Sequence, residues 1–99
     1  MHFVVFATHR EETGQERASL AEAFTAYLDD PSHHPGVIVR ERGPTLGDDG
    51  RTVNGLLLVV EAPGLGAARA FVADSPFGQA NIFAESHVRP WKRLTGHSG

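Results

Sequence analysis

Leu56-Leu57-Leu58-Val59-Val60 is a run of large apolar residues inside a strand that we predict over residues 53–61. Successive side chains of a strand point to opposite faces of its sheet, so this run puts large apolar groups on both faces. Leaving such groups in water costs roughly 25 cal/mol per Å² of apolar area. Both faces of the sheet that contains this strand must therefore be covered.

The apolar patterns on either side of this run predict the remaining elements. The segment 3–8 is short, β-branched and aromatic, which suits a buried strand. Leu20, Phe24 and Leu28 recur at helical spacing and form an apolar stripe. We expect strands at residues 3–8, 37–42, 53–61 and 82–91, and helices from about 14 to 29 and from 65 to about 74.

Local signals mark where these helices begin and end. Thr13-Gly14-Gln15-Glu16 has the spacing in which a hydroxyl and a carboxylate bind the free amides of a helix start. Pro31 and Pro35 end the first helix, because proline has no amide donor. Ser75 followed by Pro76 is typical of a helix cap and a first-turn proline, so a short helical turn should follow the second helix.

The predicted order is β-α-β-β-α-β, which places both helices on one face of an antiparallel four-stranded sheet. One layer of helices shields only one of the two apolar faces. No other predicted element is large enough to hide the second face. We therefore expect two copies of the chain to associate through their sheets as a homodimer.

Composition excludes several classes of function. A chain of 99 residues with 40% apolar residues fits one domain, and its net charge of −3 with scattered Lys and Arg makes nucleic acid a poor partner. Without cysteine there is no disulfide, thiolate nucleophile or Cys-based zinc site. No apolar run approaches the roughly 20 residues of a membrane helix, and no leader pattern is present, so we expect a cytoplasmic protein with no membrane partner.

Short motifs follow one another in a characteristic order along nearly the whole chain. They are Phe3-Val4-Val5, Arg17 seven residues before Phe24-Thr25-Ala26-Tyr27-Leu28, Gly43-Pro44, Asp48-Asp49-Gly50, Asn54-Gly55, Glu61, the Ala-Ala-x-Ala-Phe of 67–71, Ser75-Pro76-Phe77 and Arg89-Pro90-Trp91. In this order and spacing the chain resembles the YciI-like (YCII-related) family. The resemblance implies a ferredoxin-like βαββαβ α+β fold of the dimeric α+β barrel type. Residues 1–94 would form the single domain, and 95–99 a flexible tail.

Members of this family carry a His on the first helix and an Asp immediately before the proline that follows the second helix, and the two have been proposed to act together. An Asp can orient an imidazole while the imidazole moves a proton. The matching positions in this chain are Phe24 and Ser75, and neither can perform that chemistry. Asp74 is one residue away and is a further candidate neighbour of the pocket, but on a helix this offset turns a side chain by roughly 100°, so it is not equivalent to the family Asp.

Other polar groups near these positions are candidates for a pocket. His9 follows the first strand, where loop residues often line ligand sites, although solvent exposure is the simpler interpretation. Arg17 has forked donors for an anion, with a helical Glu as its alternative partner. Tyr27 has a hydroxyl for a pocket, but an aromatic residue on an apolar stripe is typically core. His33-His34 lacks a metal-binding spacing and is expected in a solvated loop.

Our leading hypothesis is a small dimeric protein that binds a small organic molecule between its helices and its sheet, around Phe24, Tyr27 and Ser75. It would use no cofactor and no metal. One alternative is a cofactor-independent oxygenase or isomerase on the same architecture. Another is an accessory subunit of a larger enzyme. The sequence does not choose between these alternatives.

Overall fold

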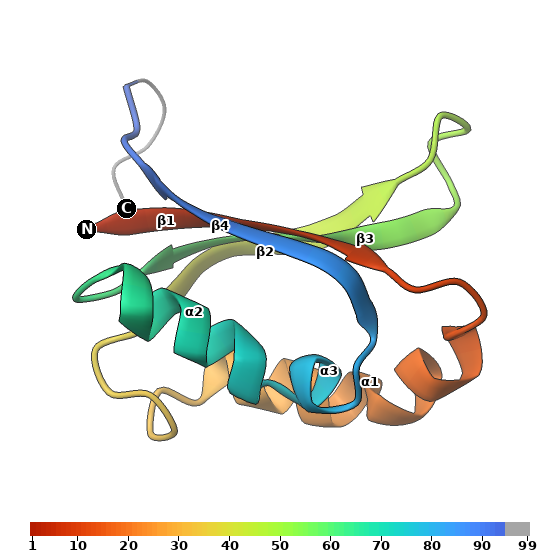
Figure 1. The fold of residues 1–99 in the computed structure, drawn as a ribbon, viewed down its shortest axis with the longest axis horizontal. Helices are drawn as coiled ribbons and strands as arrows, with labels where there is room; N and C mark the ends of the chain where they lie inside the picture. Colours follow the sequence, from red (N-terminus) through yellow and green to blue (C-terminus); the bar gives the residue numbers. More distant parts are fainter. Residues whose placement is uncertain (95–99) are drawn as a thin grey trace.

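The structure is a computed structural model that describes residues 1–94 (Figure 1). The predicted ferredoxin-like order of strands and helices is confirmed, and the turn expected after Ser75 is a short third helix. The elements are β1 (His2–His9), α1 (Gly14–Asp29), β2 (Ile38–Leu46), β3 (Val53–Glu61), α2 (Leu65–Asp74), α3 (Pro76–Gln79) and β4 (Phe83–Trp91). The flexible tail predicted at 95–99 lies outside the described residues.

The four strands form one antiparallel sheet in the order β2-β3-β1-β4. The three helices lie together against one face of this sheet (Figure 1). Val5 in the centre of β1 pairs with Leu58 of β3 on one side and with Val88 of β4 on the other. Phe3, Val5, Val60 and Ile82 are fully buried, so the core lies between the sheet and the helices.

The opposite face of the sheet carries no helix among residues 1–94 (Figure 1). Leu58 and Val60 are buried on the helix side, whereas Leu57 is only partly buried and pairs with Phe6, whose side chain is 48% exposed. Val4 is the next residue on this face of β1. The prediction that the central strand is apolar on both faces is therefore confirmed. We call Val4, Phe6 and Leu57 the bare-face patch.

Strand β2 is longer than predicted, because it continues through Gly43 and Pro44 to Leu46. The strand predicted here ended at residue 42. The strand tolerates Pro44 because β2 lies at the edge of the sheet and has a neighbouring strand on one side only. A residue without an amide donor can therefore be accommodated there. Pro44 pairs in register with Leu56, which extends the wall of the sheet beside α1.

The predicted capping role of Thr13 is wrong. Its side chain accepts no hydrogen bond from a backbone amide of α1, and its hydroxyl donates to the carbonyl oxygen of Arg10 at 2.8 Å. Thr13 has φ −102° and ψ 9°, whereas capping residues usually have an extended backbone. The hydroxyl therefore turns back into the loop.

None of the helices within residues 1–94 has the length and apolarity needed to cross a membrane.

Candidate functional site

A cavity of about 600 Å³ lies between α1 and the sheet, a volume typical of small-molecule sites. Its apolar wall includes Phe24 and Leu28 of α1, Leu56 of β3 and Phe77 of α3. Ala18 and Ala21 also line it and are exposed, which places them at its mouth. Its charged or ionisable lining groups within the described chain are His9, Arg17 and Arg42.

Phe24 occupies the position where the resemblance places a histidine. Its ring stacks on that of Phe77 with 4.1 Å between centroids and 8° between planes, and its side chain is only 7% exposed. Stacked rings of this kind contribute mostly through buried apolar area. Phe24 thus gives the cavity a flat apolar wall and carries no exchangeable proton.

His9 is the last residue of β1 and lies among aromatic rings. It stacks on Phe83 with centroids 6.2 Å apart and meets the ring of Phe77 edge-on at 6.1 Å. Both ring nitrogens are shielded from water and have no hydrogen-bond partner among residues 1–94. A buried polar group without a partner costs about 1 to 3 kcal/mol. The expectation of plain solvent exposure is therefore wrong.

Burial, and secondly the positive charge of Arg17, lowers the pKa of His9 below its ordinary value of 6.5. The imidazole is thus neutral at pH 7 and has one nitrogen free to accept a hydrogen bond. The sequence did contain a signal for this burial. Phe3, Val5, Ala7 and His9 alternate along β1, so His9 shares the face that points to the helices.

Arg17 is partly buried one helical turn after Thr13, and its Nε donates to the Thr13 hydroxyl at 3.2 Å. Within residues 1–94 it forms no ion pair with a carboxylate, so the predicted pairing with a helical Glu is wrong. Its terminal amino groups remain as donors beside the cavity. Thr13 therefore orients Arg17 without neutralising its charge.

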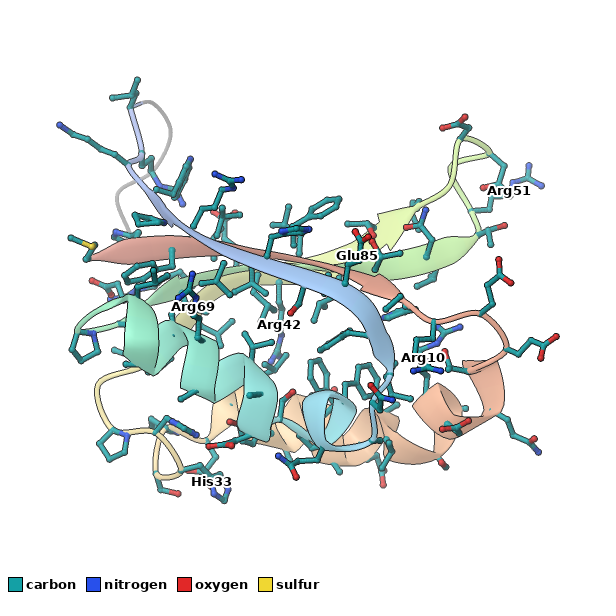
Figure 2. All side chains as sticks on the ribbon, viewed as in Figure 1. Arg10, His33, Arg42, Arg51, Arg69 and Glu85 are labelled. Atoms are coloured by element: carbon teal, nitrogen blue, oxygen red, sulfur yellow. The ribbon has the colours of Figure 1, made fainter. Side chains whose placement is uncertain are left out.

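Arg42 differs from Arg17 because its charge is paired. Figure 2 shows Arg42 directed from the sheet toward α1, where its Nη1 lies 2.6 Å from the Oδ1 of Asp29. No Asp or Glu belongs to the described lining of the cavity. The uncompensated charge at the cavity is therefore that of Arg17, which favours an anionic or electron-rich oxygen.

Tyr27 does not line the cavity. Its side chain is 8% exposed and its hydroxyl donates to the carbonyl oxygen of Phe71 at 2.7 Å. Burial, and secondly the charge of Asp74, raises the pKa of Tyr27 to about 12. The hydroxyl stays protonated at neutral pH. Tyr27 is a core residue, as its place on the apolar stripe indicated.

Ser75 and Asp74 also lie outside the cavity lining. The Ser75 hydroxyl donates to the carbonyl oxygen of Val72 at 2.6 Å and accepts from the amide of Gly78 at 3.1 Å, which confirms its role as a cap. The carboxylate of Asp74 lies 3.0 Å from Nε2 of His34. Of the six predicted site residues, the cavity brings together His9, Arg17 and Phe24, and it leaves out Tyr27, Asp74 and Ser75.

The expectation of a solvated loop holds for His33 but is wrong for His34. His33 is 57% exposed, and Figure 2 shows it at the outer side of its loop. His34 is only 19% exposed because it packs edge-on against the ring of Phe71 and pairs with Asp74. In the described part of the chain, no three His, Asp or Glu side chains gather to hold a metal ion.

A second cavity, of about 670 Å³, lies between α2 and the edge strand β4. It is lined by Arg69, His87 and Arg89 among others, and Figure 2 shows Arg69 on the side of α2 that faces the sheet. None of the predicted site residues borders it. The cavity beside α1, which contains Phe24, is therefore the better candidate.

The model of the YCII-related domain family matches residues 1–92. A structure of 5-chloro-2-hydroxyhydroquinone dehydrochlorinase from Burkholderia phenoliruptrix, in complex with 2,5-dihydroxybenzoquinone, is 30% identical. The alignment covers 93% of this chain and 94% of that one, with a TM-score of 0.77. No curated protein matches the chain.

More distant structures share the fold alone. A dimeric protein of unknown function with a ferredoxin-like fold from Bacteroides fragilis is 15% identical, with a TM-score of 0.52 over 88% of this chain and 89% of that one. A putative antibiotic biosynthesis monooxygenase from Nitrosomonas europaea is 14% identical, with a TM-score of 0.54 over 96% of this chain and 100% of that one. At these identities no activity carries over.

Proposed function

The chain belongs to the YCII-related domain family, and we propose that it binds a small planar ring bearing hydroxyl or carbonyl oxygens in the cavity between α1 and the sheet. The observation that carries the proposal is the pairing of apolar and polar walls. Phe24 and Phe77 offer flat aromatic surface. Among residues 1–94, Arg17 has no carboxylate partner for its charge, and the two ring nitrogens of His9 have no hydrogen-bond partner. Such a cavity suits a ring with oxygen substituents.

The dehydrochlorinase supports this ligand class. Its structure holds 2,5-dihydroxybenzoquinone, a flat ring whose substituents are all oxygens. The ring would lie against the apolar wall of our cavity, and one oxygen would accept from Arg17. The same likeness raises the alternative of an enzyme, because an imidazole at the cavity is a candidate proton acceptor. The oxygenase or isomerase alternative rests on fold analogy alone, and no contact among residues 1–94 favours the accessory subunit.

Calorimetric titration with 2,5-dihydroxybenzoquinone tests the proposal. The chain has no cysteine, so addition of a thiol to the quinone does not confuse the result. We expect saturable binding with one molecule per chain. Substitution Ala21→Trp puts an indole at the cavity mouth and should weaken binding at least about tenfold, or about 1.4 kcal/mol.

The matched control is Ala23→Trp, the same substitution at another exposed position of α1, outside the cavity lining. It should leave the affinity unchanged. If both variants bind as the wild type does, the ligand lies elsewhere. If the wild type does not bind the quinone at all, the proposed ligand class is wrong.

We propose also that two copies associate through the bare faces of their sheets. The bare-face patch is apolar, and a groove of about 310 Å³ beside it is lined by Val4, Phe6, His87 and Arg89. Phe6 is half-exposed in the single chain, so Phe6→Asp should leave the fold intact while it opposes association. Sedimentation velocity should show a dimer for the wild type and a monomer for this variant, with the loop variant Arg51→Glu as a dimeric control. A monomeric wild type at high concentration would contradict the dimer.

Cytoplasmic localisation stays a prediction.

A further inference from the structure

His9 is the residue whose buried polar atoms have no partner anywhere in the described chain. Other buried polar side chains, such as Thr13 and Ser75, form hydrogen bonds to backbone atoms. Buried polar groups in proteins are nearly always paired, and an exception calls for a reason. His9 borders the candidate cavity, so a bound molecule is the natural partner.

The position of His9 relates it to the missing family histidine. Phe77 lies between the two, stacked on Phe24 on one side and meeting His9 edge-on on the other. Both His9 and Phe24 line the same cavity, from β1 and from α1 respectively. An imidazole thus borders the cavity in this chain, carried by the sheet and not by the helix.

The surroundings of His9 favour its neutral form while the cavity is empty. Arg17 on α1 is the charged group that acts on it, and the rings of Phe77 from α3 and Phe83 from β4 pack against it. No carboxylate of the described lining neutralises Arg17 or orients the imidazole. A neutral imidazole beside a fixed positive charge is arranged to accept a proton from a ligand whose anion the arginine then holds.

We infer that His9 accepts a proton from an acidic hydroxyl group of the bound ring, while Arg17 holds the oxyanion that forms. The hydroxyl O–H bond breaks and its electron pair stays on oxygen, while an N–H bond forms on the imidazole. The terminal amino groups of Arg17 donate to the oxygen. Because both His9 nitrogens are shielded from water, rotation of the imidazole toward the cavity accompanies binding. This inference rests on the proposed function and adds the ionisation of the ligand to it.

The test uses 4-nitrophenol, a small phenol whose neutral and ionised forms absorb at different wavelengths. We expect the wild type to bind it as the phenolate at a pH where the free probe is the phenol. The midpoint of its ionisation should fall by about one pH unit or more on binding. His9→Phe keeps an aromatic ring among Phe77 and Phe83, and it should still bind the probe but as the phenol. His9→Gln is a second variant that keeps polarity without a basic nitrogen, and it should behave in the same way.

His34→Phe is the control, because that histidine lies outside the cavity lining and pairs with Asp74. It should give the wild-type spectrum. Binding of 4-nitrophenol as the phenol by the wild type would overturn the inference and leave the proposed function standing. A phenolate spectrum in both His9 variants would also overturn it, because Arg17 alone would then ionise the probe. Absence of binding in the wild type would overturn the inference together with the proposed function.

Discussion

Two groups of rings pack against α1, each with a histidine, and they differ in how their polar atoms are bonded. In the filled cluster, formed by Tyr27, His34, Phe71 and Asp74, the phenol hydroxyl donates to a carbonyl oxygen and the imidazole meets a carboxylate. In the cavity cluster, formed by His9, Arg17, Phe24 and Phe77, the imidazole nitrogens have no partner within residues 1–94.

This difference separates a structural cluster from a candidate site. A fully bonded polar cluster stabilises the fold and offers little to a ligand. An imidazole left without partners beside an apolar cavity and an uncompensated arginine lowers stability, unless a ligand supplies the missing bonds. Residue types alone do not distinguish the two clusters, since each has rings, a histidine and one charged neighbour. The bonding of the polar atoms does.

The largest expected effect tests whether ring packing holds the cavity cluster together. Phe24→Ala removes a 7%-exposed ring that stacks on Phe77 at 4.1 Å, and it should lower the free energy of unfolding by about 3 to 5 kcal/mol. Urea denaturation followed by circular dichroism measures this. A loss below about 1 kcal/mol would mean that the ring is not part of the packed core.

A smaller effect is expected where polar bonds hold the filled cluster. Tyr27→Phe removes the hydroxyl that donates to Phe71 at 2.7 Å and should cost about 1 to 3 kcal/mol in unfolding free energy. Because Tyr27 lies outside the cavity lining, the affinity of the variant protein for 2,5-dihydroxybenzoquinone should equal that of the wild type. A large loss of affinity without a loss of stability would move the candidate site from one cluster to the other.

The smallest effect is a dependence of stability on pH. The pKa of His9 in the folded chain lies below its ordinary value of 6.5, so the unfolded chain binds more protons and the folded state loses stability as pH falls through this value. His9→Phe removes that loss. The free energy of unfolding of the variant minus that of the wild type should therefore increase as the pH is lowered from about 8 to about 5. Urea denaturation at each pH measures this difference. A difference independent of pH would show that the imidazole titrates in the folded chain as it does in the unfolded one.

Most of the fold could be predicted from the sequence because local patterns carry it. The alternation of Leu56 to Val60, the helical spacing of Leu20, Phe24 and Leu28, and the Ser75-Pro76 pair each indicate one element from a few neighbouring residues. The exceptions depend on the neighbours of an element in the sheet. Pro44 is tolerated inside β2 only because that strand lies at the edge.

The candidate site was harder to predict because its residues meet through contacts distant in sequence. Solvent exposure was the simpler interpretation of His9 at the end of the first strand, yet it pairs with Phe83 across a register shift in the sheet and meets the ring of Phe77 edge-on. Asp74 was expected near the site, but His34 pairs with it from a loop whose path no local pattern specifies. Burial of a polar residue at the end of a strand depends on which element covers it.

A crystal structure of the protein with 2,5-dihydroxybenzoquinone tests most directly whether the cavity cluster is the ligand site. We predict the ring against Phe24 and Phe77, with one oxygen within hydrogen-bond distance of Arg17 and another within reach of the His9 imidazole. The account would be contradicted if the ring lay between α2 and β4 or on the bare face of the sheet, with both His9 nitrogens still unpartnered.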